Sequence, residues 1–156
     1  MPRNYKSTEV YLKPDPKYGS LLASKLINKL MLQGKKSIAQ RLLYDALDTV
    51  AGKVEKEPAE ILDQAIDNIR PRVEVRSKRV GGATYQVPHE VSRRRQQTLA
   101  IRWLIDSARA KRGKPMARRL ADELFDAFNN QGAAVTKKEN THKMAEANSA
   151  YAHFAW

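Results

Sequence analysis

The spacing of apolar residues changes twice along this chain, and the change limits the folds that it can adopt. Up to Ile69, apolar side chains recur every three or four residues, as on one face of an amphipathic helix. After Arg70-Pro71 they alternate with polar residues in two short runs on either side of Gly81-Gly82, and from Ser92 the helical spacing returns. The pattern predicts one β-hairpin within an otherwise helical fold.

Three helices are predicted before the hairpin. The first begins at Ser20 and carries a leucine at every fourth position. The second has Ser37 as its N-cap, a buried stripe that starts at Ile38, and an end near Gly52. The third has Pro58 in its first position, where a backbone N–H is not needed. The apolar residues predicted to be buried on these helices are Leu22, Leu26, Leu30, Ile38, Leu42, Leu43, Ala46, Leu47, Val50, Ile61, Leu62, Ala65, Ile66 and Ile69.

The hairpin is predicted at about residues 72–88, with its tip near Ser77–Ala83 and with Pro88 closing its base. A lone two-stranded hairpin is only marginally stable in water. Its base is therefore expected to pack on the helices, while its tip projects as a basic finger.

Three more helices are predicted after the hairpin. Ser92 starts a long helix and Pro115 opens the next one. Thr136 and Glu139 have the spacing of a capping box for a last, alanine-rich helix that runs almost to Trp156. The predicted fold class is therefore mainly α, a six-helix, bundle-like domain with one protruding β-hairpin between its third and fourth helices.

The length of 156 residues suits a single domain. Residues 1–19 show no sustained periodicity and contain three prolines and four Lys or Arg, which predicts an extended basic arm. Residues 20–156 are assigned to one helical domain.

Positive charge is concentrated in the middle of the chain. The fifty residues from Arg70 to Arg119 contain fifteen Lys or Arg and three carboxylates, so their net charge of +12 equals that of the whole chain. A field of this size attracts polyanions over several kT. Nucleic-acid binding is the first function that it predicts.

Four basic clusters are difficult to explain as an ordinary solvated face. Arg76-Ser77-Lys78-Arg79 lies at the predicted finger tip without a carboxylate beside it. Arg93-Arg94-Arg95 falls in the first turn of a helix, where the helix dipole disfavours cations, and Lys137-Lys138 is predicted to repeat this arrangement in the last helix. Lys35-Lys36 occupies a short loop between helices. An external polyanion would balance all four clusters.

Other cations have a carboxylate within reach on the same helix. Arg118 and Arg119 each precede an acidic residue by four positions, and Arg102 precedes Asp106 by four. Pairs with this spacing stabilise a helix surface. An internal ion pair and an RNA contact both remain open for these three arginines.

The sequence gives no support for catalysis or metal binding. It contains no cysteine, which excludes disulfides and Cys-ligated zinc or iron–sulfur sites. The three histidines, His89, His142 and His153, do not form a ligand pair at i, i+4, and no nucleophile–base arrangement stands out. The prediction is a protein that is not an enzyme and has no cofactor and no metal. No apolar run approaches the ~18 residues that span a bilayer, so no membrane partner is expected.

Two targets, DNA and RNA, fit a basic chain. In a winged-helix domain, residues 58–70 would enter the DNA major groove, but they carry Glu60, Asp63 and Asp67, which the phosphates would repel. Basic elements dispersed around a helical core suit a folded RNA better than a straight duplex. A DNA-binding regulator, usually a dimer, and an adaptor that binds a protein through the acidic stretch Asp45–Asp67 stay open as alternatives, and an enzyme is the least favoured class.

Six segments of the chain carry a further signal. They are Gln33–Ser37, Arg70–Arg76, Arg79–Pro88, Gly113–Ala117, Asn130–Val135 and Thr141–Asn148. They resemble the family of the bacterial small-subunit ribosomal protein called S-seven, and the likeness covers essentially the whole chain. The sequence departs from the family pattern at His89, where an aliphatic residue is usual, and at Ala155, where arginine is frequent.

The resemblance implies a six-helix structural protein with a β-ribbon arm that binds the 3′ major domain of small-subunit ribosomal RNA and nucleates assembly of the subunit head. It also implies a place at the exit site near tRNA and mRNA, a C-terminal helix close to the neighbouring protein S-eleven, and a cytoplasmic location. We expect the free protein to be a monomer. The residues assigned to RNA binding are Arg3, Lys6, Lys35, Lys36, Arg72, Arg76, Lys78, Arg79, Gly81, Gly82, Arg94, Arg95, Arg102, Lys114, Met116, Lys137, Lys138, His142 and Lys143.

Overall fold

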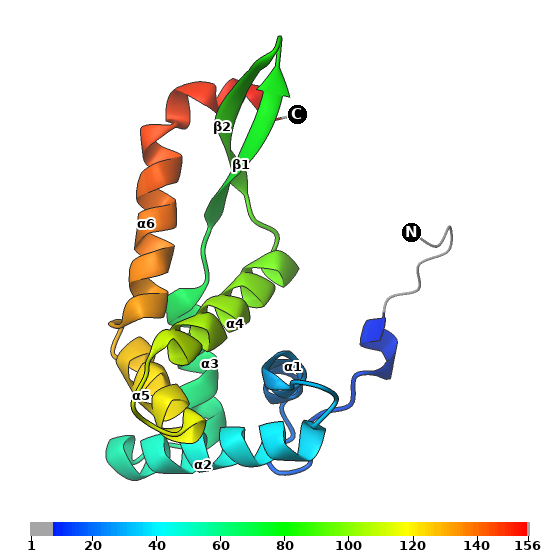
Figure 1. Ribbon diagram of the computed structural model, residues 1–156, viewed down its shortest axis with the longest axis vertical. Coiled ribbons are helices and arrows are strands. Elements are labelled where there is room, and N and C mark those ends of the chain that lie inside the picture. The colour runs from blue at the N-terminus through cyan, green and yellow to red at the C-terminus, as the bar shows by residue number, and fades with distance from the viewer. Residues whose placement is uncertain (1–7, 156) are drawn as a thin grey trace.

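The computed structural model describes residues 8–155 and shows a mainly helical protein from which one β-hairpin extends (Figure 1). The predicted fold class and the place of the hairpin, between the third and fourth helices, are confirmed. The elements are η1 (Thr8–Tyr11), α1 (Leu21–Leu30), α2 (Lys36–Val54), α3 (Pro58–Ile69), β1 (Val73–Val80), β2 (Ala83–Glu90), α4 (Arg93–Ala110), α5 (Met116–Phe128), α6 (Ala133–Ala147) and η2 (Ser149–Phe154), where η marks a 3-10 helix.

The core lies among α1 to α5 with the first turn of α6, and α5 packs against α2, α3 and α4 at its centre. The apolar stripes predicted on the first three helices are buried, except that Leu42 is half-buried and Ile38 is 52% exposed. Leu99, Trp103 and Leu104 of α4 are buried as the helical spacing indicates.

The prediction for the start of α2 was wrong. Lys35 occupies the N-cap position and Lys36 is the first helical residue, so Ser37 is not the cap. The buried stripe consequently begins at Ala39, and Ile38 lies on the solvent side. The helix also runs past Gly52 to a C-cap at Glu55, whose φ of 55° ends it in the left-handed conformation.

The prediction for the start of α6 was also wrong, for a tertiary reason. The helix begins at Ala133 after Gly132, and the hydroxyl of Thr136 donates to the Gly132 carbonyl instead of capping the helix. The backbone N–H of Ala134 is satisfied by the buried carboxylate of Glu123 on α5, 2.8 Å away. Because another helix supplies this acceptor, no local capping box is needed. The helix also ends earlier than predicted, and η2 continues the chain.

The hairpin is longer and tighter than predicted. Its strands pair without interruption from Val73 opposite Glu90 to Val80 opposite Ala83, so residues 77–80 belong to β1 and not to a loop. The turn consists of Gly81 and Gly82 alone, with φ of 56° and 90°. Two left-handed glycines suit the short turns whose twist matches that of the strands. The hairpin extends beyond the helical body beside α6 (Figure 1).

Candidate nucleic-acid interface

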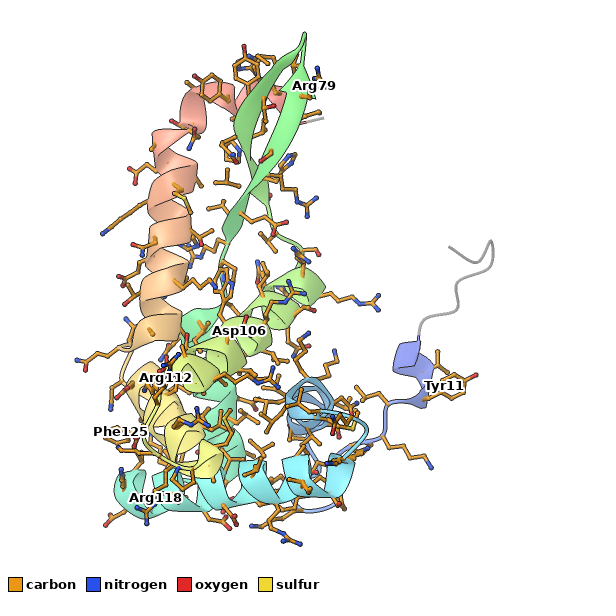
Figure 2. All side chains as sticks on the ribbon, viewed as in Figure 1. Tyr11, Arg79, Asp106, Arg112, Arg118 and Phe125 are labelled. Atoms are coloured by element: carbon orange, nitrogen blue, oxygen red, sulfur yellow. The ribbon has the colours of Figure 1, made fainter. Side chains whose placement is uncertain are left out.

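The end of the hairpin presents an uncompensated cation. Arg79 lies near the tip and is exposed (Figure 2), and within residues 8–155 no carboxylate lies at ion-pair distance from it. A Cβ added at Gly81 or Gly82 would meet nothing within 4 Å, so the turn is open to a partner and positive φ alone explains both glycines.

One face of the hairpin is covered by the C-terminal segment. The ring of Tyr85 lies 5.2 Å from that of Tyr151 and 5.3 Å from that of Phe154, measured between centroids. The ammonium of Lys78 donates to the Phe154 carbonyl over 2.9 Å. Lys78, predicted to bind RNA, therefore also ties η2 to β1, and the tip is less bare than the sequence suggested.

A buried carboxylate joins the base of the hairpin to α4. Glu74 is 8% exposed and accepts hydrogen bonds from Arg76 on its own strand and from Arg95 on α4, the latter over 3.3 Å. Burial alone would raise the pKa of Glu74, but the Arg76 hydrogen bond and the charges of both arginines outweigh it and lower that pKa. Two predicted RNA contacts, Arg76 and Arg95, thus share one internal counter-charge.

The start of α4 carries cations against the helix dipole, as predicted. Arg93 and Arg94 are exposed in its first turn, which contains no acidic residue, and the Ser92 side chain makes no capping bond. Further along, Arg102 is exposed, and the described residues include no ion pair between it and Asp106. The exposed surface of α4 is therefore cationic over several turns.

The start of α2 adds a second, separate group of cations, Lys35 at its N-cap and Lys36 in its first position. Lys35 and Lys36 are both exposed, and neither is paired with an acidic residue in the part of the chain that the structure describes. They follow the exposed, left-handed Gly34, which turns the chain between the helices.

The cations of α6 have mixed surroundings. Because α6 begins at Ala133, Lys137 and Lys138 lie in its second turn and not in its first. Lys138 donates to the Asn68 carbonyl over 2.7 Å and so caps the end of α3. Lys137 and Lys143 are exposed.

His142 fastens the base of the hairpin to α6. Its Nε2 accepts the backbone N–H of Arg72 over 3.0 Å, which requires the neutral ring. Burial lowers the pKa of His142, and the charges of Lys138 and Arg72 lower it further. The side chain of Arg72 is itself exposed. His142 therefore has a structural role that the sequence did not indicate.

Two of the predicted contacts near α5 are held by the protein itself. The ammonium of Lys114 contacts the carboxylate of Asp122 at 2.7 Å, and Met116 is half-buried against the core. Arg119 does not pair with Glu123 but donates to the Arg109 and Lys111 carbonyls at the end of α4. For Arg119, the suggested i, i+4 partner is therefore replaced by carbonyl groups at the end of α4.

The predicted arm residues Arg3 and Lys6 lie outside the described residues. The root of the arm is firmly anchored, since Asp15 is 2% exposed and accepts the hydroxyl of Tyr44 over 2.8 Å. Burial and this hydrogen bond raise the pKa of Tyr44 to about 12. Lys17 adds an ion pair with Asp48 at 2.7 Å.

Comparison with known protein families matches residues 2–149 to the family of ribosomal protein S7p/S5e. The chain belongs to this family. It is 56% identical over 156 residues to the small ribosomal subunit protein uS7 of Bifidobacterium longum subsp. infantis, covering all of both chains. It is also 58% identical over 143 residues to uS7 of Thermosipho africanus, covering 92% of each chain, and 55% identical over 156 residues to uS7 of Xanthobacter autotrophicus, covering all of both.

Membership of the S7p/S5e family confirms the resemblance seen in the sequence. A ribosomal protein of this kind is a structural, RNA-binding component of the translation machinery in the cytoplasm, and it is not an enzyme. Among residues 8–155, no helix is long and apolar enough to cross a membrane, and no group of three or more metal-ligating side chains is found in the same range.

This S7p/S5e protein also has a groove that the sequence did not predict. It lies between η1 and its following residue, α1 and α4, and its volume is about 500 Å³. The groove residues of α4 are about seventy residues from those of α1 along the chain, so only the folded structure brings them together. The lining residues are Tyr11, Leu12, Lys25, Asn28, Lys29, Gln97, Thr98 and Ile101.

Proposed function

We propose that this chain is a component of the small ribosomal subunit that binds the 3′ major domain of the ribosomal RNA and nucleates assembly of the subunit head. In this proposal the hairpin extends toward exit-site tRNA and mRNA, and the C-terminal segment lies near protein S-eleven. The free protein is a monomer. The names of its relatives as small-subunit proteins, and the family resemblance of the six quoted segments, support this role.

The observation that carries the proposal is a set of exposed cations, on several separate elements, that no carboxylate of the described chain neutralises. These cations are Lys35, Lys36, Arg72, Arg79, Arg93, Arg102, Lys137 and Lys143. Phosphates neutralise such groups with release of counterions, which supplies much of the affinity for a nucleic acid. Because the cations come from the start of α2, the hairpin and two further helices, an irregular folded RNA fits them better than a straight duplex.

The structure gives no advantage to the alternative of a DNA-reading helix. The polar face of α3 exposes Glu60, Asp63 and Asp67, and two phosphate strands would repel these carboxylates. This face is one part of the acidic stretch Asp45–Asp67 considered for an adaptor, and in the proposed complex it is directed away from RNA.

Binding of the purified chain to a transcript of the 3′ major domain, measured at several salt concentrations, tests the proposal. The logarithm of the affinity should fall by roughly 0.7–0.9 per phosphate neutralised for each tenfold rise in salt. An RNA of equal length from another ribosomal domain is the matched control and should bind more weakly. A flat salt dependence, or equal affinity for both RNAs, would contradict the proposal, and chemical footprinting would identify the protected nucleotides.

A further inference from the structure

We propose that the groove between η1, α1 and α4 holds one unpaired nucleobase of the bound RNA, stacked on Tyr11 and hydrogen-bonded at its edge by Gln97 and Asn28. This inference rests on the proposed function, because it requires that the chain bind RNA. It adds a contact with base preference to an interface otherwise dominated by phosphates.

The size and lining of the groove suit a nucleotide. Its volume of about 500 Å³ lies within the ~300–1,000 Å³ of small-ligand sites. Tyr11, Leu12 and the buried Ile101 give it apolar walls, while the amides of Asn28 and Gln97 supply hydrogen-bonding groups. Single-stranded bases in proteins are bound by this combination of a ring for stacking and polar groups for the edge.

Tyr11 is available as a stacking platform. The residue is 80% exposed, and none of the described aromatic rings stacks on it. It lies on η1 (Figure 2) and lines the groove together with residues of α1 and α4. The chain just after it is pinned, since the hydroxyl of Ser24 donates to the Lys13 carbonyl over 2.7 Å. This hydrogen bond orders the backbone two residues after Tyr11 before binding, so less conformational entropy is lost there when a base stacks.

Gln97 is oriented by a neighbour, and this sets the base edge that it can bind. The ammonium of Lys25 donates to Oε1 of Gln97 over 2.8 Å. The amide nitrogen, a donor of two hydrogens, is then directed to other acceptors. Asn28 is exposed on α1 and supplies a further amide. A donor from Gln97 favours O4 of uracil or O6 of guanine over the amino group that cytosine or adenine carries at the corresponding ring position.

An exposed lysine of the groove suits the backbone of the same nucleotide. Lys29 is exposed beside Asn28, whereas Lys25 is half-buried and donates to Gln97. Ammonium groups at the rim of a base pocket attract the phosphate that follows the base. The groove thus contains separate groups for the base plane, the base edge and the phosphate.

Affinity for the 3′ major-domain RNA at several salt concentrations tests the stacking contact. Tyr11→Ala should weaken binding by roughly 5- to 100-fold and leave the salt slope unchanged, because stacking releases no counterions. Val10→Ala is the matched control, since Val10 is 85% exposed on the same short helix and does not line the groove. It should bind as the unmodified chain does. An equal effect of both substitutions, or a shallower slope for Tyr11→Ala alone, would overturn the proposal.

Competition by hexamers of uridylate and of adenylate tests the base edge. The unmodified chain should prefer the uridylate hexamer, and Gln97→Met, which keeps the length of the side chain but removes its amide, should abolish that preference. Gln131→Ala, at an exposed position outside the groove, should retain it. No preference in the unmodified chain, or its persistence in both Gln97→Met and Asn28→Ala, would overturn the proposal. If the unmodified chain fails to bind the ribosomal RNA at all, the proposed function fails; if it binds and the groove variants match their controls, only this inference fails.

Discussion

The cations at the end of α4 and those of the hairpin come from the same basic stretch of sequence, yet their surroundings differ. Lys111 contacts the buried carboxylate of Glu123 at 2.8 Å and that of Asp126 at 3.2 Å. Arg72 and Arg79 are exposed and have no acidic partner within residues 8–155. The first group neutralises charge inside the protein, whereas the second leaves charge for a partner. Net charge along a sequence therefore indicates that a polyanion binds, but the fold decides which cations bind it.

The largest expected effect tests the cation at the end of α4 that is paired inside the protein, Lys111. Lys111→Ala should lower the free energy of unfolding by about 3–5 kcal/mol, because it leaves the carboxylate of Glu123, which is 0% exposed, without its cation. Lys114→Ala is the control: its partner Asp122 is half-exposed, so the loss should stay below about 1 kcal/mol. Urea denaturation measures both. Equal losses of unfolding free energy would mean that burial of the carboxylate does not make one ion pair more stabilising than the other.

The next largest effect concerns Glu74, whose carboxylate accepts hydrogen bonds from both Arg76 on the hairpin and Arg95 on α4. Glu74→Gln should cost about 1–3 kcal/mol of unfolding free energy at pH 7, because hydrogen bonds to a buried charge are weakened. The folded-state pKa of Glu74 is lowered, so its stabilising contribution is present above the unfolded pKa of about 4.3 and is lost as pH falls through the folded value.

Denaturation of Glu74→Gln and of the unmodified chain between pH 7 and pH 3 checks this sign. The difference in unfolding free energy should shrink below about pH 4. Glu90→Gln, at an exposed position of β2, should change stability by less than about 0.5 kcal/mol at any of these pH values. A difference that grows on acidification would contradict the assigned role of Glu74.

For the exposed cations of the hairpin, Arg72 and Arg79, we expect a smaller effect on stability but a measurable effect on RNA binding. The double substitution of Arg72 and Arg79 by alanine should change the unfolding free energy by less than about 0.5 kcal/mol. Its slope of log affinity against log salt should be shallower by roughly 0.7–0.9 for each phosphate contact removed. Lys114→Ala, which removes an internally paired cation, should keep the original slope. If Lys114→Ala reduces the slope of log affinity against log salt and the double substitution does not, then the internally paired lysine binds RNA and the exposed arginines do not.

The sequence was sufficient for the helices and the hairpin because their patterns are local. The leucines of α1 and the apolar face of α3 repeat at helical spacing, and each stripe is buried as predicted. The errors occurred where a distant residue replaced a local signal. Thr136 has the spacing of a cap, but Glu123 on α5 supplies the acceptor for the start of α6.

The site could be predicted less completely for the same reason. Charge and the resemblance pointed to cationic residues as the site, but the partners that the structure gives these cations are distant in sequence. Lys138 reaches the carbonyl of Asn68, and Lys78 reaches that of Phe154. The proposed nucleobase groove could not be predicted from the sequence, since Tyr11 and Gln97 come to line one groove only after α1 and α4 have packed.

The smallest expected effect is a pH dependence at the base of the hairpin, between the two groups of cations. His142 accepts the Arg72 N–H in its neutral form, and it is faced by Lys138 on α6, by Arg72 before β1, and by Arg70 and Asp67 from the end of α3. Burial lowers the pKa of His142 below the ordinary value of about 6.5, with Lys138 and Arg72 adding to the shift.

The unfolded chain therefore takes up a proton at His142 before the folded protein does, so this contribution to stability is present above about pH 6.5 and is lost as pH falls toward the folded value. Solvent screening at a half-buried site should keep the loss below about 0.5 kcal/mol. His142→Gln should remove this part of the pH dependence between pH 7.5 and pH 5.5, while His153→Gln, at an exposed position of η2, should retain it. If His142→Gln keeps the full pH dependence, then protonation of this ring does not weaken the junction between the hairpin base and α6, and the contacts of Lys78 and Tyr85 with η2, farther along the hairpin, hold it more than His142 does.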